Sequence, residues 1–166
     1  MKNPFKVKGN FKISTFLIQV FMPLIGGALV GYLNRNTMGQ YIELTKPFFA
    51  PPGIVFPIVW AILYLLMGVS AYRIYMLGMS GEDVSSAMFF YYIQLIFNYL
   101  WVFIFFSFRL YGLACIELAI LFILVLITFI KFFRKDKLAG ILLIPYLLWL
   151  IFAGVLNFYI WLLNEA

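Results

Sequence analysis

Residues 110–130 read LYGLACIELAILFILVLITFI, a run of 21 residues in which Glu117 is the one charged side chain. An α-helix rises ~1.5 Å per residue, so about 20 residues cross a ~30 Å hydrocarbon core. This run therefore has the length and composition of a membrane span. Four further apolar runs of similar length occupy residues 13–33, 53–76, 87–108 and 139–163.

The composition agrees with this interpretation. The chain is 66% hydrophobic and 11% charged, with a mean hydropathy of +1.05, outside the range of soluble domains. A membrane β-barrel would need alternating segments of ~10 residues, whereas these runs are longer and apolar on every side. We predict an all-α integral membrane protein, a single domain over residues 1–166 that forms one five-transmembrane-helix bundle. The first run exceeds the ~7–15 apolar residues of a cleaved signal peptide, so we predict that it is a span.

The basic residues predict the orientation of the bundle. With five spans, one side of the membrane carries nine of the twelve: Lys2, Lys6, Lys8, Lys12, Arg73, Lys131, Arg134, Lys135 and Lys137. The other side carries Arg35, Lys46 and Arg109. Because basic loops are retained in the cytoplasm, the N-terminus should be cytoplasmic. The net charge of +6 is then explained by the orientation of the protein in the membrane and by contact with anionic lipid headgroups, and it does not indicate nucleic-acid binding.

The missing residue types exclude several chemistries. The chain has no histidine and one cysteine, Cys115, so a histidine-containing catalytic triad, a zinc site of the common types and a bis-histidine haem are excluded within it. We expect no metal and no required cofactor. Glu117 is the one acid inside a predicted span, which weakens a proton-coupled pump. It could pair with Arg109, snorkel or stay protonated, and a structural role is favoured.

Polar and aromatic residues share helix faces inside the spans. Gln94, Asn98 and Trp101 are spaced i, i+4, i+7, as Trp149 and Ala153 are spaced i, i+4. Two roles fit the amides of Gln94 and Asn98 equally well. They could form hydrogen bonds between packed helices, or they could form a polar patch beside the aromatic wall of a ligand pocket. The tryptophans lie a few residues inside their runs, where an interfacial anchoring role explains them less well.

Two further patterns concern helix packing and the first loop. Gly27 and Gly31 form a G-x-x-x-G in the first run, which fits either close packing within the chain or a homodimer interface. Residues 44–53 read LTKPFFAPPG after Tyr41. Three prolines prevent a helix up to Pro52 and start the next helix cleanly. A stiff loop with aromatic side chains predicts a lid over one mouth of the bundle.

The chain resembles the TspO/MBR family, the tryptophan-rich sensory proteins and the mitochondrial translocator protein, once called the peripheral benzodiazepine receptor. The K-P-x-x-x-P-P loop matches at 46–52, and P-x-x-W-x-x-L-Y-x-x-M-G matches at 57–68. In the third span Q-L-x-x-N-x-x-W-x-x-x-F-F-x-x-R matches at 94–109, and P-Y-x-x-W-x-x-F-x-x-x-L-N matches at 145–157 in the fifth. The matches occur in order and cover roughly residues 41–161.

The resemblance implies five helices with a pocket beneath the first loop. Family members bind protoporphyrin IX and related tetrapyrroles, isoquinoline carboxamide and benzodiazepine-type drugs, and in some members cholesterol. By motif, the ligand-binding residues here would be Tyr41, Pro51, Pro52, Trp60, Asn98, Trp101, Trp149 and Ala153. Some bacterial members promote light-dependent porphyrin breakdown, which would give Trp60 and Trp149 a photochemical catalytic role, with the porphyrin as ligand.

The chain departs from the family pattern at the loop and near its end. Phe48-Phe49 replaces the usual Ser-Trp, and Gln40-Tyr41 replaces a common Trp-Tyr, so the ligand preference could differ. No basic residue follows Tyr159, which removes the main sequence support for sterol binding.

Three functional hypotheses follow. The first is a tetrapyrrole receptor or carrier in which Asn98 and Trp149 orient the ligand and the loop gates access. The second is a photoreactive protein that degrades porphyrin with Trp60 and Trp149. The third is a small exporter of apolar compounds, which the near absence of intramembrane charge disfavours. The short C-terminal end and the lack of an Arg-rich, Ser-rich presequence favour a bacterial plasma membrane.

Overall fold

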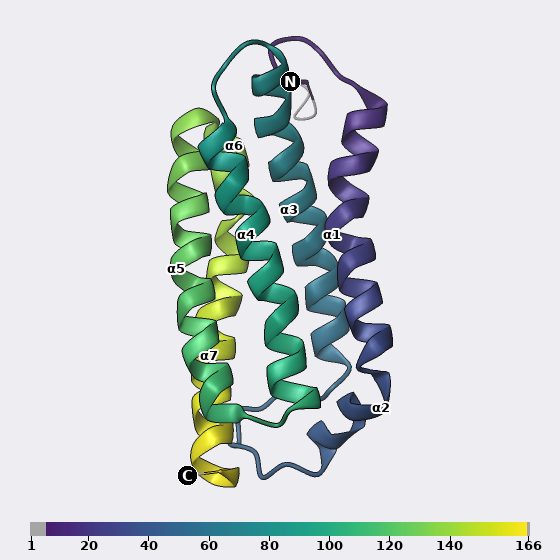
Figure 1. The fold of residues 1–166 in the computed structure, drawn as a ribbon, viewed down its shortest axis with the longest axis vertical. Helices are drawn as coiled ribbons and strands as arrows, with labels where there is room; N and C mark the ends of the chain where they lie inside the picture. The colour runs from purple at the N-terminus through teal and green to yellow at the C-terminus, as the bar shows by residue number, and fades with distance from the viewer. Residues whose placement is uncertain (1–5, 166) are drawn as a thin grey trace.

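The chain folds into an all-α bundle with five spans, which confirms the predicted fold class (Figure 1). The computed structural model describes residues 6–165, so Lys2 lies outside the described residues. The long helices are α1 (Ile13–Leu33), α3 (Val55–Met79), α4 (Ser85–Val102), α5 (Tyr111–Lys135) and α7 (Ile144–Asn164). The shorter elements are α2 (Arg35–Met38), the 3₁₀-helix η1 (Gly39–Ile42), the π-helix η2 (Phe103–Ser107) and α6 (Lys137–Ile141).

The apolar runs locate the helices, while local chemistry sets their ends. Helix α5 continues past the predicted end at residue 130, and its last turn carries Arg134 and Lys135. Basic side chains are favourable there because the free carbonyl groups of a helix C-terminus carry partial negative charge. The predicted helix over 139–163 is divided between α6 and α7. Pro145 lies in the first turn of α7, and in a continuous helix its ring would clash with the carbonyl of residue 141.

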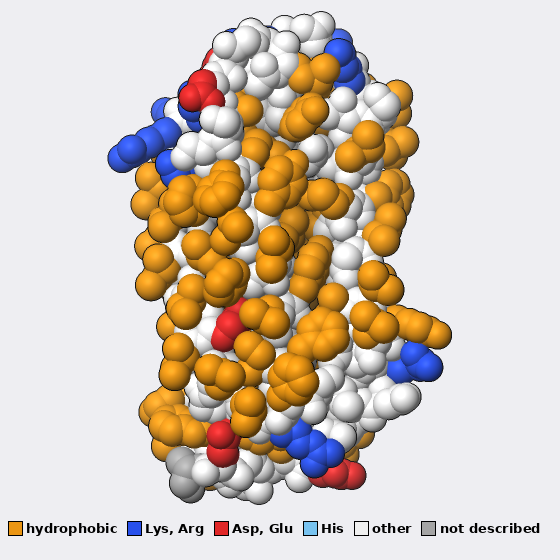
Figure 2. All heavy atoms as spheres, viewed as in Figure 1, with side chains coloured by type: hydrophobic (Ala, Val, Ile, Leu, Met, Phe, Trp, Pro, Cys, Tyr) orange, Lys and Arg blue, Asp and Glu red, His pale blue; other side chains and the backbone are white. Residues whose placement is uncertain are grey.

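The surface of the bundle is that of an integral membrane protein. Apolar side chains cover its middle, and most of the charged side chains in this view lie toward its two ends (Figure 2). The buried share of the most apolar window is 22% in α1 and at most 39% in any span. No span is mostly buried, and each has an outer face on which only lipid acyl chains can surround apolar side chains favourably.

The spans pack in a defined order. Helix α1 lies against α3, α4 against α5, and α5 against α7. The loop between α1 and α3 crosses the end of the bundle where the C-terminus lies, while the α3–α4 and α5–α6 connections lie at the opposite end with the N-terminal segment (Figure 1). This arrangement places the predicted lid at the end opposite most of the basic residues.

A largely buried ion pair fastens the end that carries the basic residues. Arg73 of α3 donates from Nε and Nη2 to the two carboxylate oxygens of Asp136, at 3.0 and 2.6 Å. The backbone N–H of Ala139 donates to the same carboxylate at 2.9 Å. Burial alone would raise the pKa of Asp136, but these hydrogen bonds hold it below its ordinary value. The pair thereby joins α3 to the corner between α5 and α6.

Replacing Asp136 by Asn should destabilise the bundle, because it removes the carboxylate charge that accepts two hydrogen bonds from the largely buried Arg73 guanidinium. We expect a loss of about 2–3 kcal/mol, seen as a melting temperature lower by roughly 5 °C in detergent. The wild-type contribution should be present above pH ~4 and lost as the pH falls through the lowered pKa of Asp136. Glu82→Gln, which breaks the more exposed pair with Lys8, is the control and should change the melting temperature little. Equal melting temperatures for D136N and E82Q would contradict this assignment.

Candidate ligand-binding site

The loop between α1 and α3 is held in one conformation by its lysine. The Lys46 ammonium donates to the carbonyl oxygens of Tyr41, Ile42 and Leu44 at 2.7, 2.9 and 3.1 Å, and it lies 5.0 Å from the centre of the Tyr41 ring. The Tyr41 hydroxyl donates to the Pro51 carbonyl at 3.1 Å. Burial raises the pKa of this hydroxyl, so it remains a donor. The loop therefore carries its own internal bonds.

The loop is also attached to the end of α7. The Asn164 side chain accepts from the Thr45 backbone N–H at 3.0 Å and donates to the Thr45 carbonyl at 2.9 Å. The Phe49 ring packs edge-on against Tyr159, with centroids 5.5 Å apart. Phe48 is fully exposed. Of the two phenylalanines in the predicted lid, only Phe49 therefore fastens the loop to the bundle.

A large cavity lies beneath this loop. Its volume is about 760 Å³, within the ~300–1,000 Å³ range of organic ligand sites. Its walls come from four segments: α1, the α2–η1 turn, the start of α3, and the α4–η2 junction. The lining is Leu24, Gly27, Ala28, Val30, Gly31, Met38, Gly39, Tyr41, Ile42, Gly53, Ile54, Phe56, Pro57, Trp60, Ala61, Tyr64, Trp101, Val102 and Phe106.

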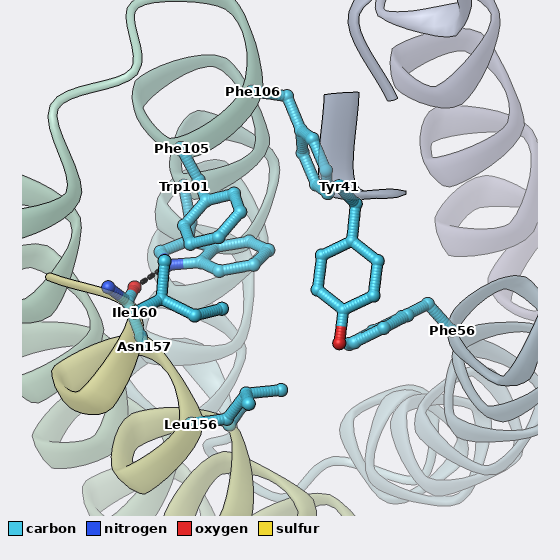
Figure 3. A pocket seen from close by; sticks show the side chains of 9 residues that line it. Tyr41, Phe56, Trp101, Phe105, Phe106, Leu156, Asn157 and Ile160 are labelled. Atoms are coloured by element: carbon cyan, nitrogen blue, oxygen red, sulfur yellow. Dashed lines mark hydrogen bonds between the residues drawn. The ribbon is translucent and has the colours of Figure 1, made fainter. Parts of the chain in front are cut away.

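A second, smaller cavity adjoins the large one on the side of α7. It holds about 20 Å³, roughly the space of one water molecule, and nine side chains line it (Figure 3). Tyr41, Phe56, Trp101 and Phe106 belong to both linings. These four aromatic rings form the wall between the two spaces, so a ligand that displaced them would reach from α1 across to α7.

The residues singled out in the sequence divide into three groups. Tyr41, Trp60 and Trp101 line the large cavity. Ala153 lines only the smaller one. The others belong to neither lining: Pro51, Pro52, Asn98 and Trp149.

Asn98 has partners inside the protein. The Tyr64 hydroxyl donates to its Oδ1 at 2.6 Å, and its Nδ2 donates to the Tyr146 hydroxyl at 2.8 Å. The Tyr146 hydroxyl in turn donates to Gln94 Oε1 at 3.0 Å. Only Tyr64 of these four reaches the large cavity. These bonds support the interhelical packing role that was considered for Gln94 and Asn98. Asn98 holds Tyr64, which lines the cavity, without lining the cavity itself.

Trp101 and Trp149 are held in place by different interactions. The Trp101 indole N–H donates to Asn157 Oδ1 at 3.1 Å (Figure 3), and Asn157 donates to the Tyr111 carbonyl at 2.9 Å. Trp149 lies between the rings of Phe56 and Phe152, at 6.0 and 5.3 Å. Among the described residues its buried N–H has no hydrogen-bond partner. The direction of the Trp101 ring is thus fixed by a hydrogen bond, whereas Trp149 is held by its packing against Phe56, Phe152 and the core.

Comparison with known proteins identifies the chain. The family model described as "TspO/MBR family" matches residues 19–162. The chain belongs to the TspO/MBR family. It is 38% identical to the tryptophan-rich sensory protein of Cereibacter sphaeroides, over 87% of this chain and 85% of that protein. It is 36% identical to tryptophan-rich protein TspO of Chlorobaculum tepidum (93% and 99% covered) and 33% identical to the human translocator protein (84% and 85% covered).

This TspO/MBR protein uses residues in its cavity that the sequence reasoning did not select. Phe56, Tyr64 and Phe106 complete the aromatic wall. Gly27 lies against the Tyr64 ring, and a Cβ there would come within 2.2 Å of Tyr64 Cε2. A Cβ on Gly31 would meet no atom within 4 Å, because this glycine faces the cavity. The G-x-x-x-G pattern was the feature of the sequence that pointed to these two glycines. In the structure, Gly27 allows close packing within the chain and Gly31 leaves space for the cavity.

Replacing Tyr64 by Phe should weaken the wall of this TspO/MBR protein. The substitution removes a donor from the buried Asn98 Oδ1, and an unsatisfied buried acceptor costs about 1–3 kcal/mol. We expect a lower melting temperature in detergent. Tyr75→Phe is the matched control, because Tyr75 lies on the exposed side of the same helix and should tolerate the change. If Y64F melts at the temperature of Y75F, the network does not stabilise the bundle.

Proposed function

We propose that this protein is a membrane receptor or carrier that binds protoporphyrin IX, or a related tetrapyrrole, in the large cavity beneath the first loop. The observation that carries the proposal is the cavity itself, about 760 Å³ with an aromatic wall. The Trp60 and Tyr64 rings stack in that wall, with centroids 5.5 Å apart and planes 28° apart. A flat aromatic ligand can extend such a stack favourably.

The character of the lining supports the same class of ligand. None of the residues that line the large cavity is charged, so an apolar ring system fits there, with its charged substituents directed toward the loop. Isoquinoline carboxamide and benzodiazepine-type drugs share this flat, apolar shape and should compete for the site. The names of relatives, sensory protein and translocator protein, agree with a receptor or carrier.

We also propose that the loop and the cavity face the outer side of a bacterial plasma membrane. The N-terminal segment, the α3–α4 connection and the α5–α6 corner share one end of the bundle (Figure 1). Because the basic residues concentrate there, the positive-inside rule favours a cytoplasmic position for that end. The ligand site then lies near the opposite surface.

Filling the cavity should weaken binding without unfolding the protein. Gly31→Phe places a ring in open space, so we expect protoporphyrin IX to bind at least about tenfold more weakly while the melting temperature stays unchanged. The measurement is saturable quenching of tryptophan fluorescence in the dark. Leu29→Phe, which adds a ring on the exposed face of the same helix, is the control. Undiminished binding by G31F would place the ligand elsewhere.

A photochemical activity is the second candidate, and Trp60 favours it because its indole lines the cavity. An indole in contact with a photoexcited porphyrin can donate an electron to it, with molecular oxygen as the co-reactant. Trp60→Phe should therefore reduce product formation under illumination more than Trp149→Phe does, since Trp149 lies outside the lining. Product absorbance measured at equal porphyrin occupancy tests this. A larger loss in W149F would contradict the assignment to Trp60.

A further inference from the structure

The large cavity has exposed lining residues between α1 and α3 as well as in the loop region. The exposed residues of its lining on the spans are Ala28 of α1 and Pro57 and Ala61 of α3. The other exposed members belong to the loop region: Met38, Gly39, Ile42, Gly53 and Ile54. No lining residue from α4 or η2 is exposed. On the spans, the cavity therefore has its mouth where α1 and α3 separate.

The two helices are in close contact farther from the loop. A Cβ on Gly68 would come within 2.5 Å of the Val20 Cα, and Gly27 lies against the Tyr64 ring. Nearer the loop this contact ends, because Gly31 faces open space. Helices α1 and α3 thus form a V whose open end contains the cavity.

The positions of Ala28 and Ala61 along their helices imply that the mouth reaches the depth of the acyl chains. Ala28 is five residues before the end of α1, and Ala61 is six residues after the start of α3. At ~1.5 Å per residue these positions lie roughly 8–9 Å inside the ends of their helices. With a hydrocarbon core ~30 Å thick, the mouth borders lipid. The exposed surfaces beside it, such as Ile58 and Ile62, are apolar as well.

The other sides of the cavity are closed by hydrogen bonds. On the α1–α4 side, the Tyr99 hydroxyl donates to the Pro23 carbonyl at 3.0 Å. Nearer the loop, the Ser107 hydroxyl donates to Asn34 Oδ1 at 2.6 Å. Toward water, the loop carries the bonds of Lys46 described above and the Thr45–Asn164 pair, which fixes it to α7. These bonds oppose a displacement of the loop, and none of them joins α1 to α3 at the mouth.

We propose that the ligand enters and leaves sideways, from the hydrocarbon layer, through the mouth bordered by Ala28, Pro57 and Ala61, while the loop stays closed. This inference rests on the proposed function, since it assumes that the large cavity is the ligand site. Entry from the hydrocarbon layer narrows the ligand class to flat apolar molecules that dissolve in the bilayer. It also makes Ala61 a residue that controls the rates of exchange.

The test measures protoporphyrin IX exchange with the full chain in lipid nanodiscs, by stopped-flow tryptophan quenching. Thr45→Cys with Asn164→Cys, made in a Cys115→Ala background, locks the loop by a disulfide between residues that already touch. Ala61→Phe narrows the mouth. Ile62→Phe is its matched control, one position along the same helix, exposed and outside the cavity lining. Asn164→Ala, which releases the loop from α7, serves as a second loop variant that needs no disulfide.

The proposal expects the locked loop, the released loop and I62F to exchange at wild-type rates within about twofold. A61F should slow association and dissociation together, by about tenfold or more, with little change in the dissociation constant. Slower association with a locked loop, or faster association in N164A, would overturn the lateral route. Faster dissociation alone in A61F would also overturn it, because Ala61 would then only shape the site. Absence of saturable quenching in the wild type would instead refute the proposed function itself.

Discussion

The rest of this structure depends on the lack of water in the hydrocarbon layer. There, every backbone N–H and C=O must find its partner within the chain, which allows long helices and little else. The same constraint acts on side chains that face inward. Tyr64, Asn98, Tyr146 and Gln94 satisfy one another in a connected series. A polar network of this kind joins α3, α4 and α7 and gives the aromatic wall in front of it a fixed position.

The cavity exists because two segments prevent the bundle from closing. Gly31 leaves space on α1 where a larger side chain would fill it. The loop that follows α1 is too well bonded to collapse inward, since Lys46 occupies three of its carbonyl groups and Asn164 binds both backbone groups of Thr45. A cover held by these bonds lies over two helices that diverge, and the space between them is the cavity.

The departures from the family pattern affect the loop more than the cavity. Phe49 stands where the family usually has tryptophan, and it packs on α7 outside both cavity linings. Phe48 faces outward. We therefore expect these positions to tune how firmly the loop is attached, while ligand shape is selected by the rings of Tyr41, Trp60 and Trp101. Differences in ligand preference within the family need not involve residues that touch the ligand.

The sequence by itself determined the five spans, the concentration of basic residues at one end, the stiff loop and the family. Each of these depends on composition, on length or on motifs that are local in the chain. Helical spacing also put Asn98 and Trp101 on one face, but it did not say which neighbours that face meets. Only the tertiary structure decided that Asn98 binds Tyr64 and Tyr146, that Trp149 lies outside both linings, and that Gly31 opens the cavity. The physical reason is that hydrogen-bond partners and cavities arise between helices distant in sequence, and their packing depends on the whole bundle.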